Sequence, residues 1–383
     1  MDLALSDEQQ MMQATARAFA EKEIVPFARD WDRTEVMDPT IVGKLGDIGF
    51  LGATIPAELG GSPCDNLAYC LMMEELGRAD SSVRGVVSVS LGLVTKTLLK
   101  YASDDIKQRW IPQLCAGATV GCFCLTEPGT GSDAGNLETR ATRDGDDWLI
   151  TGNKQFITNG NWAGVGLVFA RTGGPGARGV SVFAVDMTSP GITRTKVHGK
   201  LGLRAQDTAE IAFDEVRVPD SSRVGELGEG FKIAMAALGK GRMSVAAACV
   251  GIAQACLDAS LQYTLDRIQF GRPIAGFQLV QEMLADMSVE IDAARLMVWK
   301  VADLIDRHEP HELAASKAKL YCSEVAVRAA NNAIQLHGGY GFVDEYPVGR
   351  YMRDARVTTL YEGTSQVQKL IIGRALTGLN AFN

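Results

Sequence analysis

Apolar side chains in the first 118 residues recur at the intervals of amphipathic helices. Ser6 and Gln9 form a capping-box pattern, and Ser103 precedes two acidic residues, as at a second helix start. After the first of these caps, apolar residues recur at four-residue steps: Met12, Ala16, Ala20 and Ile24. This spacing places them on one helical face, so residues 1–118 are predicted to form an N-terminal α-helical domain.

From residue 119 to 228 the pattern changes to short β-prone runs separated by Gly, Thr and Asn. Such runs occupy residues 148–151, 165–170, 180–185 and 211–218. Asp144-Gly145 is a turn signal, and Pro219 closes the last run. These features predict a central β domain over residues 119–228.

The helical period returns after Gly230. A stripe of apolar residues steps alternately by four and three positions, as in antiparallel helix packing: Val280, Leu284, Met287, Ile291, Ala294, Val298, Val301 and Ile305. Residues 244–260 are rich in Ala and other small side chains, which lets a neighbouring helix approach closely. Residues 229–383 are therefore predicted to form a C-terminal helical domain, and the whole chain to be mainly α with a β middle domain.

Composition excludes several classes of function. The net charge of −8 argues against nucleic acid, because phosphate binding depends on clustered Lys and Arg. No run approaches the ~18 apolar residues of a membrane span, and the N-terminus lacks a basic segment followed by an apolar one, so we expect a cytoplasmic protein. The eight cysteines include no C-x-x-C pair, and Pro310 separates His308 from His311. Buried free thiols and no metal site are expected.

Four segments have compositions that folding alone does not require. Residues 123–133 form a Gly-rich loop that ends in hydroxyl and acidic groups, and residues 156–160 are an aromatic β segment ending in a turn. Residues 335–341 contain three glycines after a long helix, where one would suffice as a cap. Residues 361–366 place the carboxylate of Glu362 beside a glycine, two hydroxyls and an amide. Taken singly, residues 123–133 could be a linker and residues 156–160 a strand end. Residues 335–341 could supply a helix C-cap, and residues 361–366 an N-cap.

Taken together, these segments resemble the acyl-CoA dehydrogenase family in order and spacing along essentially the whole chain. The matching motifs lie at residues 126–133, 156–160, 267–271, 335–339 and 361–366. The resemblance implies a helical N-terminal domain, a central β-barrel or sandwich and a C-terminal four-helix bundle. It also implies FAD as cofactor, and a homotetramer built as a dimer of dimers in which a neighbouring subunit completes the FAD site.

The resemblance assigns FAD contacts position by position. The flavin end falls to Phe123, Leu125, Thr126, Gly131, Ser132, Phe156, Ile157 and Thr158. The pyrophosphate and adenine end falls to Arg267 and Phe270. The FAD contacts are completed by Gln278, Gln335, Leu336, His337, Gly338 and Gly339. Further FAD contacts fall to Thr364, Ser365 and Gln366. Many relatives carry Trp at the position of Phe156, so the aromatic wall is kept while an indole N–H donor is lost.

The resemblance further implies that Glu362 removes the α-proton of an acyl thioester while the β-hydride passes to the flavin. Some members of the family carry the base at the position of Gly241, which has no side chain to act, and this favours Glu362. Substrate contacts are implied for Ser132, Gly239, Lys240, Arg242, Tyr361 and Gly363. The ending of the chain resembles short-chain and branched-chain members and favours a short or branched acyl group. The family's dehydrogenases pass their electrons to an electron-transferring flavoprotein, which is therefore the expected acceptor.

One position departs from the family pattern. Gly239 stands where an Asp usually meets the pantetheine arm, and Lys240 adds a positive charge beside it. An acyl carrier protein could therefore replace CoA as the carrier, and an oxidase using O₂ would share the scaffold. Nitroalkane oxidation on a related scaffold uses Asp as its base, whereas this chain has Glu362. DNA-binding relatives need a basic surface, whereas this chain has a net charge of −8. A catalytically inactive scaffold would be expected to have lost the base, which this chain keeps. These three readings are disfavoured.

Overall fold

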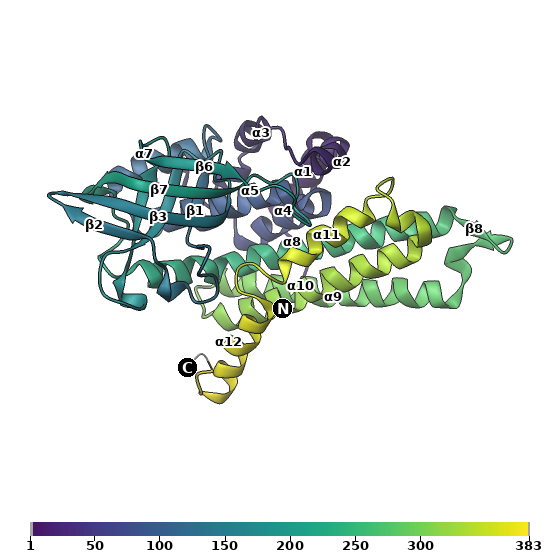
Figure 1. Cartoon of the computed structure of the whole chain (residues 1–383). Helices are drawn as coiled ribbons and strands as arrows, with labels where there is room; N and C mark the ends of the chain where they lie inside the picture. The colour runs from purple at the N-terminus through teal and green to yellow at the C-terminus, as the bar shows by residue number, and fades with distance from the viewer. Residues whose placement is uncertain (1–2, 382–383) are drawn as a thin grey trace.

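The computed structural model describes residues 3–381 and confirms the predicted order of helices, β-sheet and helices (Figure 1). The N-terminal helices are α1 (Asp7–Glu23), α2 (Val25–Thr34), α3 (Ile41–Asp47), α4 (Asn66–Ala79), α5 (Ser81–Val87), the π-helical η3 (Ser88–Thr95), α6 (Lys96–Tyr101) and α7 (Asp104–Cys115). The predicted capping box is present, since the Ser6 hydroxyl accepts from the Gln9 N–H at 3.2 Å and the Gln9 side chain accepts from the Ser6 N–H at 3.0 Å.

The middle of the chain forms one curled sheet. Its strands are β1 (Gly121–Cys124), β2 (Arg140–Asp144), β3 (Asp147–Thr158), β4 (Val165–Arg171), β5 (Val180–Asp186), β6 (Ile192–Lys196) and β7 (Thr208–Pro219). They pair in the order β1-β4-β2-β3-β7-β6, with β5 added to β4. The four predicted runs lie within β3, β4, β5 and β7. The strands β1, β2 and β6 were not predicted, because they are short and β2 and β6 alternate with charged residues.

The C-terminal part packs long helices against the N-terminal ones. They are α8 (Gly230–Asp266), α9 (Gln278–Asp306), α10 (Glu312–His337), α11 (Val348–Thr358) and α12 (Ser365–Thr377), with a small hairpin of β8 (Ile268–Gln269) and β9 (Arg272–Pro273) between α8 and α9. The predicted apolar stripe lies on α9, where five of its members are buried: Met287, Ile291, Ala294, Val298 and Val301. The stripe prediction is therefore confirmed.

The small residues of α8 allow the predicted close approach of a neighbouring helix. A Cβ on Gly251 would lie 2.0 Å from the Glu74 carbonyl oxygen of α4, and a Cβ on Gly77 would lie 2.7 Å from the Ala248 carbonyl oxygen. By length and composition, Ser81–Tyr101 and Gly230–Asp266 could each cross a membrane. The apolar windows of these helices are 83% and 78% buried inside the protein, which is the behaviour of core helices.

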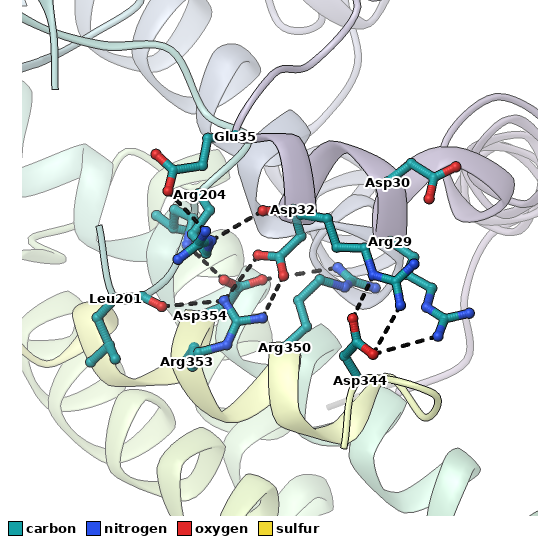
Figure 2. A network of polar contacts seen from close by, with 12 residues as sticks. Arg29, Asp30, Asp32, Glu35, Leu201, Arg204, Asp344, Arg350, Arg353 and Asp354 are labelled. Atoms are coloured by element: carbon teal, nitrogen blue, oxygen red, sulfur yellow. Dashed lines mark hydrogen bonds and ion pairs between the residues drawn. The ribbon is translucent and has the colours of Figure 1, made fainter. Parts of the chain in front are cut away.

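A network of ion pairs fastens α2 to α11 and to the segment that follows β6 (Figure 2). Arg353 on α11 binds the Asp32 carboxylate on α2 and donates to the Leu201 carbonyl oxygen. Arg204 pairs with Glu35 at 2.8 Å. The Asp354 carboxylate accepts from the Leu203 N–H at 2.6 Å, and burial, followed by the charge of Asp80, raises its pKa to about 7. These contacts fix α11, which leads directly into the segment of Glu362.

Candidate active site

Glu362 lies on the turn between α11 and α12, in a backbone conformation that favours glycine. Its φ is 51°, and Gly363 follows with φ of 88°. Three interactions hold this turn: the Gln368 amide donates to the carbonyl oxygens of Glu362 and Gly363 at 3.1 and 3.0 Å, and Lys319 Nζ donates to the Gly363 carbonyl oxygen at 2.9 Å. Thr364 caps α12 by accepting from the Val367 N–H at 3.2 Å. A left-handed residue so restrained is typical of a functional turn.

The Glu362 carboxyl group points into the protein. Its Oε2 is buried and has no hydrogen-bond partner within residues 3–381. Burial raises the pKa of Glu362 to about 7, because desolvation penalises the charged form. The positive charges of Arg84, Lys319 and Arg242 act in the opposite direction. The group is therefore a carboxylate with free lone pairs and a proton affinity suited to proton abstraction near neutral pH.

Gly241 of α8 makes room for this carboxylate. A Cβ at Gly241 would lie 2.3 Å from Glu362 Oε2 and 3.0 Å from its Cδ. The two positions for which the resemblance implies a base, Gly241 on α8 and Glu362 on the turn after α11, therefore face one another. Arg242, the next residue on α8, donates to the Ser316 hydroxyl at 3.1 Å.

Several functional neighbours of Glu362 were not predicted individually from the sequence. Arg84 on α5 donates to the Tyr361 hydroxyl at 2.6 Å and is 2% exposed. Lys319 on α10 is also buried, and burial lowers its pKa to about 8. The available signal for Arg84 was its charge within an otherwise small and apolar helical segment, residues 81–95. For Lys319, in a helix that also carries Lys317, the sequence carried no such signal.

The flavin-contact candidates at the ends of β1 and β3 lie side by side. The Gln155 N–H donates to the Thr126 carbonyl oxygen at 2.9 Å, which joins the Gly-rich loop to the end of β3. A Cβ on Gly131 would meet nothing within 4 Å, so the loop presents open backbone. Phe156 has φ of 58° and is 64% exposed, an unusual position for an aromatic ring without a ligand. This cradle fits a planar heterocycle such as a flavin.

A buried ion pair between Glu127 and Lys154 holds the Gly-rich loop in place. Glu127 accepts from Lys154 Nζ at 2.8 Å and from the N–H groups of Glu138 and Thr139 at 2.6 and 2.9 Å. Thr158 accepts from the Gln206 amide at 3.0 Å. Breaking a buried, hydrogen-bonded pair of this kind leaves an uncompensated charge, so the loop is held in one shape.

The second group of FAD candidates lies far from the first within one chain. Arg267 caps α8, Phe270 lies on the β8–β9 hairpin, and Gln278 begins α9. Residues 335–339 end α10 nearby, since the Arg267 guanidinium lies 5.7 Å from the ring of Tyr340. Figure 1 shows β8 at the opposite end of the molecule from the sheet. A single chain does not bring the two groups together.

The candidate substrate contacts also fall into separate places in the structure. Tyr361, Gly363 and Arg242 surround Glu362, whereas Ser132 lies on the exposed Gly-rich loop. Burial lowers the pKa of Lys240, with a further contribution from the charge of Lys100. A Cβ on Gly239 would meet nothing within 4 Å.

All eight cysteines are free thiols, and only Cys64 is not fully buried.

Comparison with known proteins gives concordant matches. Models of the acyl-CoA dehydrogenase N-terminal, middle and C-terminal domains match residues 6–118, 122–216 and 228–377. The mouse mitochondrial short-chain specific acyl-CoA dehydrogenase is 43% identical over 96% of this chain and 90% of its own length. The butyryl-CoA dehydrogenase of Megasphaera elsdenii superposes with a TM-score of 0.96 at 38% identity, over 98% of this chain and all of that one. A glutaryl-CoA dehydrogenase of Mycobacterium smegmatis in complex with FADH2 superposes with a TM-score of 0.95 at 34% identity, over 99% and 97%.

Proposed function

The chain belongs to the acyl-CoA dehydrogenase family, as a FAD-dependent oxidoreductase of short acyl-CoA thioesters, and we propose that Glu362 is its catalytic base. The observation that supports this role is the buried, unpartnered Oε2 of a carboxyl group whose pKa is raised to about 7. An α C–H beside a thioester is a very weak acid, and a carboxylate at an ordinary pKa of about 4.3 would be a poor match for it.

The residues around Glu362 fix the position of its carboxyl group, leave space for it and adjust its charge. The turn held by Gln368 and Lys319 fixes the carboxylate, and Gly241 leaves the space in which it stands. The cations near the carboxyl group keep a fraction of it ionised at neutral pH in spite of its burial. By resemblance, the backbone N–H of Glu362 would bind the thioester carbonyl and stabilise the negative charge that develops there.

FAD would lie against the ends of β1 and β3, with Phe156 and Thr158 on one side and the Gly-rich loop on the other. When bound, FAD supplies the oxidant that takes up the β-hydrogen with its electron pair. The distant group around Arg267 and residues 335–339 would serve the FAD of a neighbouring subunit. The separation of the two groups within one chain supports a site that two subunits share. The resemblance extends this to a homotetramer built as a dimer of dimers.

The remaining assignments follow the same resemblance. An electron-transferring flavoprotein would accept the electrons, and the enzyme would work in the cytoplasm. CoA carries the acyl group in the named relatives, while the missing carboxylate at Gly239 and the positive charge of Lys240 make an acyl carrier protein the second candidate carrier. Faster turnover of one acyl group on carrier protein than on CoA would favour that second candidate.

Substitution of the base tests the central assignment. Glu362→Gln should retain yellow, FAD-loaded protein but lose at least about 10³-fold in kcat, the scale of a general base. The surface variant Glu309→Gln alters a carboxylate that is paired with Arg307. It should keep both the bound FAD and the normal kcat. Flavin absorbance and reduction by butyryl-CoA are measured. Near-normal turnover by the Gln variant would contradict the assignment.

A further inference from the structure

The side chain of Gln206 is buried between the end of β3 and helix α5, where it contacts one of the candidate flavin residues. Gln206 is 6% exposed, and its Nε2 donates to the Thr158 hydroxyl at 3.0 Å. Its main chain is fixed on both sides. The Gln206 N–H donates to the Leu203 carbonyl oxygen at 3.1 Å, and Lys200 Nζ donates to the Gln206 carbonyl oxygen at 2.9 Å. The amide is therefore held in one place against the end of β3.

Gly85 on α5 leaves the space that the Gln206 amide occupies. A Cβ on Gly85 would lie 1.9 Å from Gln206 Oε1 and 2.9 Å from its Cδ, and the third-nearest heavy atom, at 3.7 Å, also belongs to Gln206. The backbone at Gly85 is helical and has no positive φ, so its conformation does not require glycine. Glycine weakens a helix relative to alanine. The close approach of the Gln206 side chain is therefore the reason for a glycine at this position.

The Thr158 hydroxyl accepts from Gln206 and still has its own hydrogen to donate. An amide nitrogen only donates and a hydroxyl carries one hydrogen, so the Thr158 O–H is turned away from Gln206. The hydrogen bonds of residues 3–381 leave this O–H without an acceptor. Thr158 is partly exposed and is the last residue of β3, the strand end at which FAD would lie. The donor is therefore available to a ligand at that end.

We propose that Gln206 is a positioning residue for the flavin: by donating to Thr158, its amide directs the Thr158 O–H toward an acceptor atom of the flavin ring. Reduction adds electrons to that ring, and hydrogen bonds to charged acceptors are the stronger ones. A donor held there stabilises the reduced flavin more than the oxidised flavin. Gln206 therefore favours flavin reduction, and it acts through Thr158. The inference rests on the proposed function only in taking the end of β3 as part of the flavin site.

Withdrawal of the Thr158 donor tests the inference. In Gln206→Glu the new carboxylate only accepts, so the Thr158 O–H turns toward it and away from the flavin. We expect the equilibrium constant for flavin reduction to fall about tenfold, which for a two-electron couple is a fall of about 30 mV in midpoint potential. The potential is measured by equilibrating the FAD-loaded protein with a reference dye, without substrate. Gln113→Glu, which alters an exposed amide on α7, should leave the potential unchanged.

Gly85→Ala displaces the same amide without adding a charge. The new methyl group would meet the end of a flexible side chain rather than backbone, so the protein should fold while the Gln206 amide leaves its place. The Thr158 hydroxyl then loses the donor that orients it, and the equilibrium constant should fall about threefold, or about 14 mV. Gly43→Ala on α3, where a Cβ would meet nothing within 4 Å, is the matched control. Gly85→Ala also carries the test if Gln206→Glu does not retain FAD.

A Thr158→Val background separates a positioning role from a purely structural one. The hydroxyl is missing there, so Gln206→Glu and Gly85→Ala should no longer change the potential, because their effect passes through that group. A fall of the same size with and without the hydroxyl would overturn the inference. An unchanged potential for both variants in the presence of Thr158 would overturn it as well.

The same measurements distinguish this inference from the proposed function. If Thr158→Val alone changed neither the FAD content nor the potential, the flavin site at the end of β3 would be wrong. If Thr158→Val shifted the potential and the Gln206 and Gly85 variants did not, only the role of Gln206 would be wrong. Normal turnover by Glu362→Gln would contradict the assignment of the base and leave the potentials as expected.

Discussion

At the scale of single residues, the chemistry of the site depends on the pKa of one buried carboxyl group and on the three cations near it. Burial, opposed by Arg84, Lys319 and Arg242, places the pKa of Glu362 at about 7 rather than 4.5. Neither effect requires a metal ion, and the residues that the structure describes contain no cluster of three or more potential ligands.

The raised pKa predicts how the rate depends on pH. Glu362 must be ionised to accept a proton, so kcat/KM should rise with pH, by about tenfold per unit below the pKa, and level off above about pH 7. Initial rates of flavin reduction from pH 5 to 9 measure this profile. A flat profile between pH 5 and 7 would show that the base titrates near its ordinary value and is not desolvated.

At the scale of elements, the contact between α4 and α8 requires glycine for close approach. A Cβ on Gly251 would meet backbone atoms on α4, the Glu74 carbonyl oxygen at 2.0 Å and the Arg78 N at 2.7 Å. Neither atom is at the end of a flexible side chain. The two helices would therefore have to separate, and α4 leads into α5, which carries Arg84.

Gly251→Ala should consequently destabilise the protein by about 1–3 kcal/mol or more, the usual cost of overpacking. The matched variant is Gly43→Ala on α3, where a Cβ would meet nothing within 4 Å and alanine favours the helix. Thermal unfolding of both FAD-loaded variants measures the difference. A melting temperature of Gly251→Ala equal to that of Gly43→Ala would contradict the close approach.

At the scale of the whole molecule, large apolar side chains are exposed at the hairpin end, opposite the sheet. Phe270 on the β8–β9 hairpin is 93% exposed, and Phe342 after α10 is 92% exposed. Rings so exposed are expected at interfaces between proteins. This agrees with the proposal that Phe270 contacts the FAD of a neighbouring subunit.

Phe270→Asp should therefore weaken both assembly and cofactor retention. We expect species smaller than a tetramer and a lower flavin-to-protein ratio, because a buried charge disfavours the interface. Light scattering coupled to gel filtration, with absorbance for the flavin, measures both. Met11→Asp on α1, which changes another exposed apolar residue, is the control. An unchanged tetramer with full flavin content would argue against this contact.

The sequence by itself determined the order of elements and predicted which carboxylate acts as the base. Periodicity depends on neighbouring positions, so the stripe on α9, the cap at Ser6 and four of the seven strands could be predicted. The strands β2 and β6 could not, because their charged residues hide the alternation and their pairing depends on distant partners. Glu362 could be predicted as the base because its motif is local and because Gly241 has no side chain that could replace it.

Only the tertiary structure decided which charges are buried together. Arg84 and Tyr361 are 277 positions apart, and Lys319 comes to Gly363 from another helix. The separation of the two groups of candidate FAD contacts within one chain is likewise a property of the packed helices. Desolvation depends on everything that surrounds a group in space, so the pKa of Glu362 has no signature in local sequence.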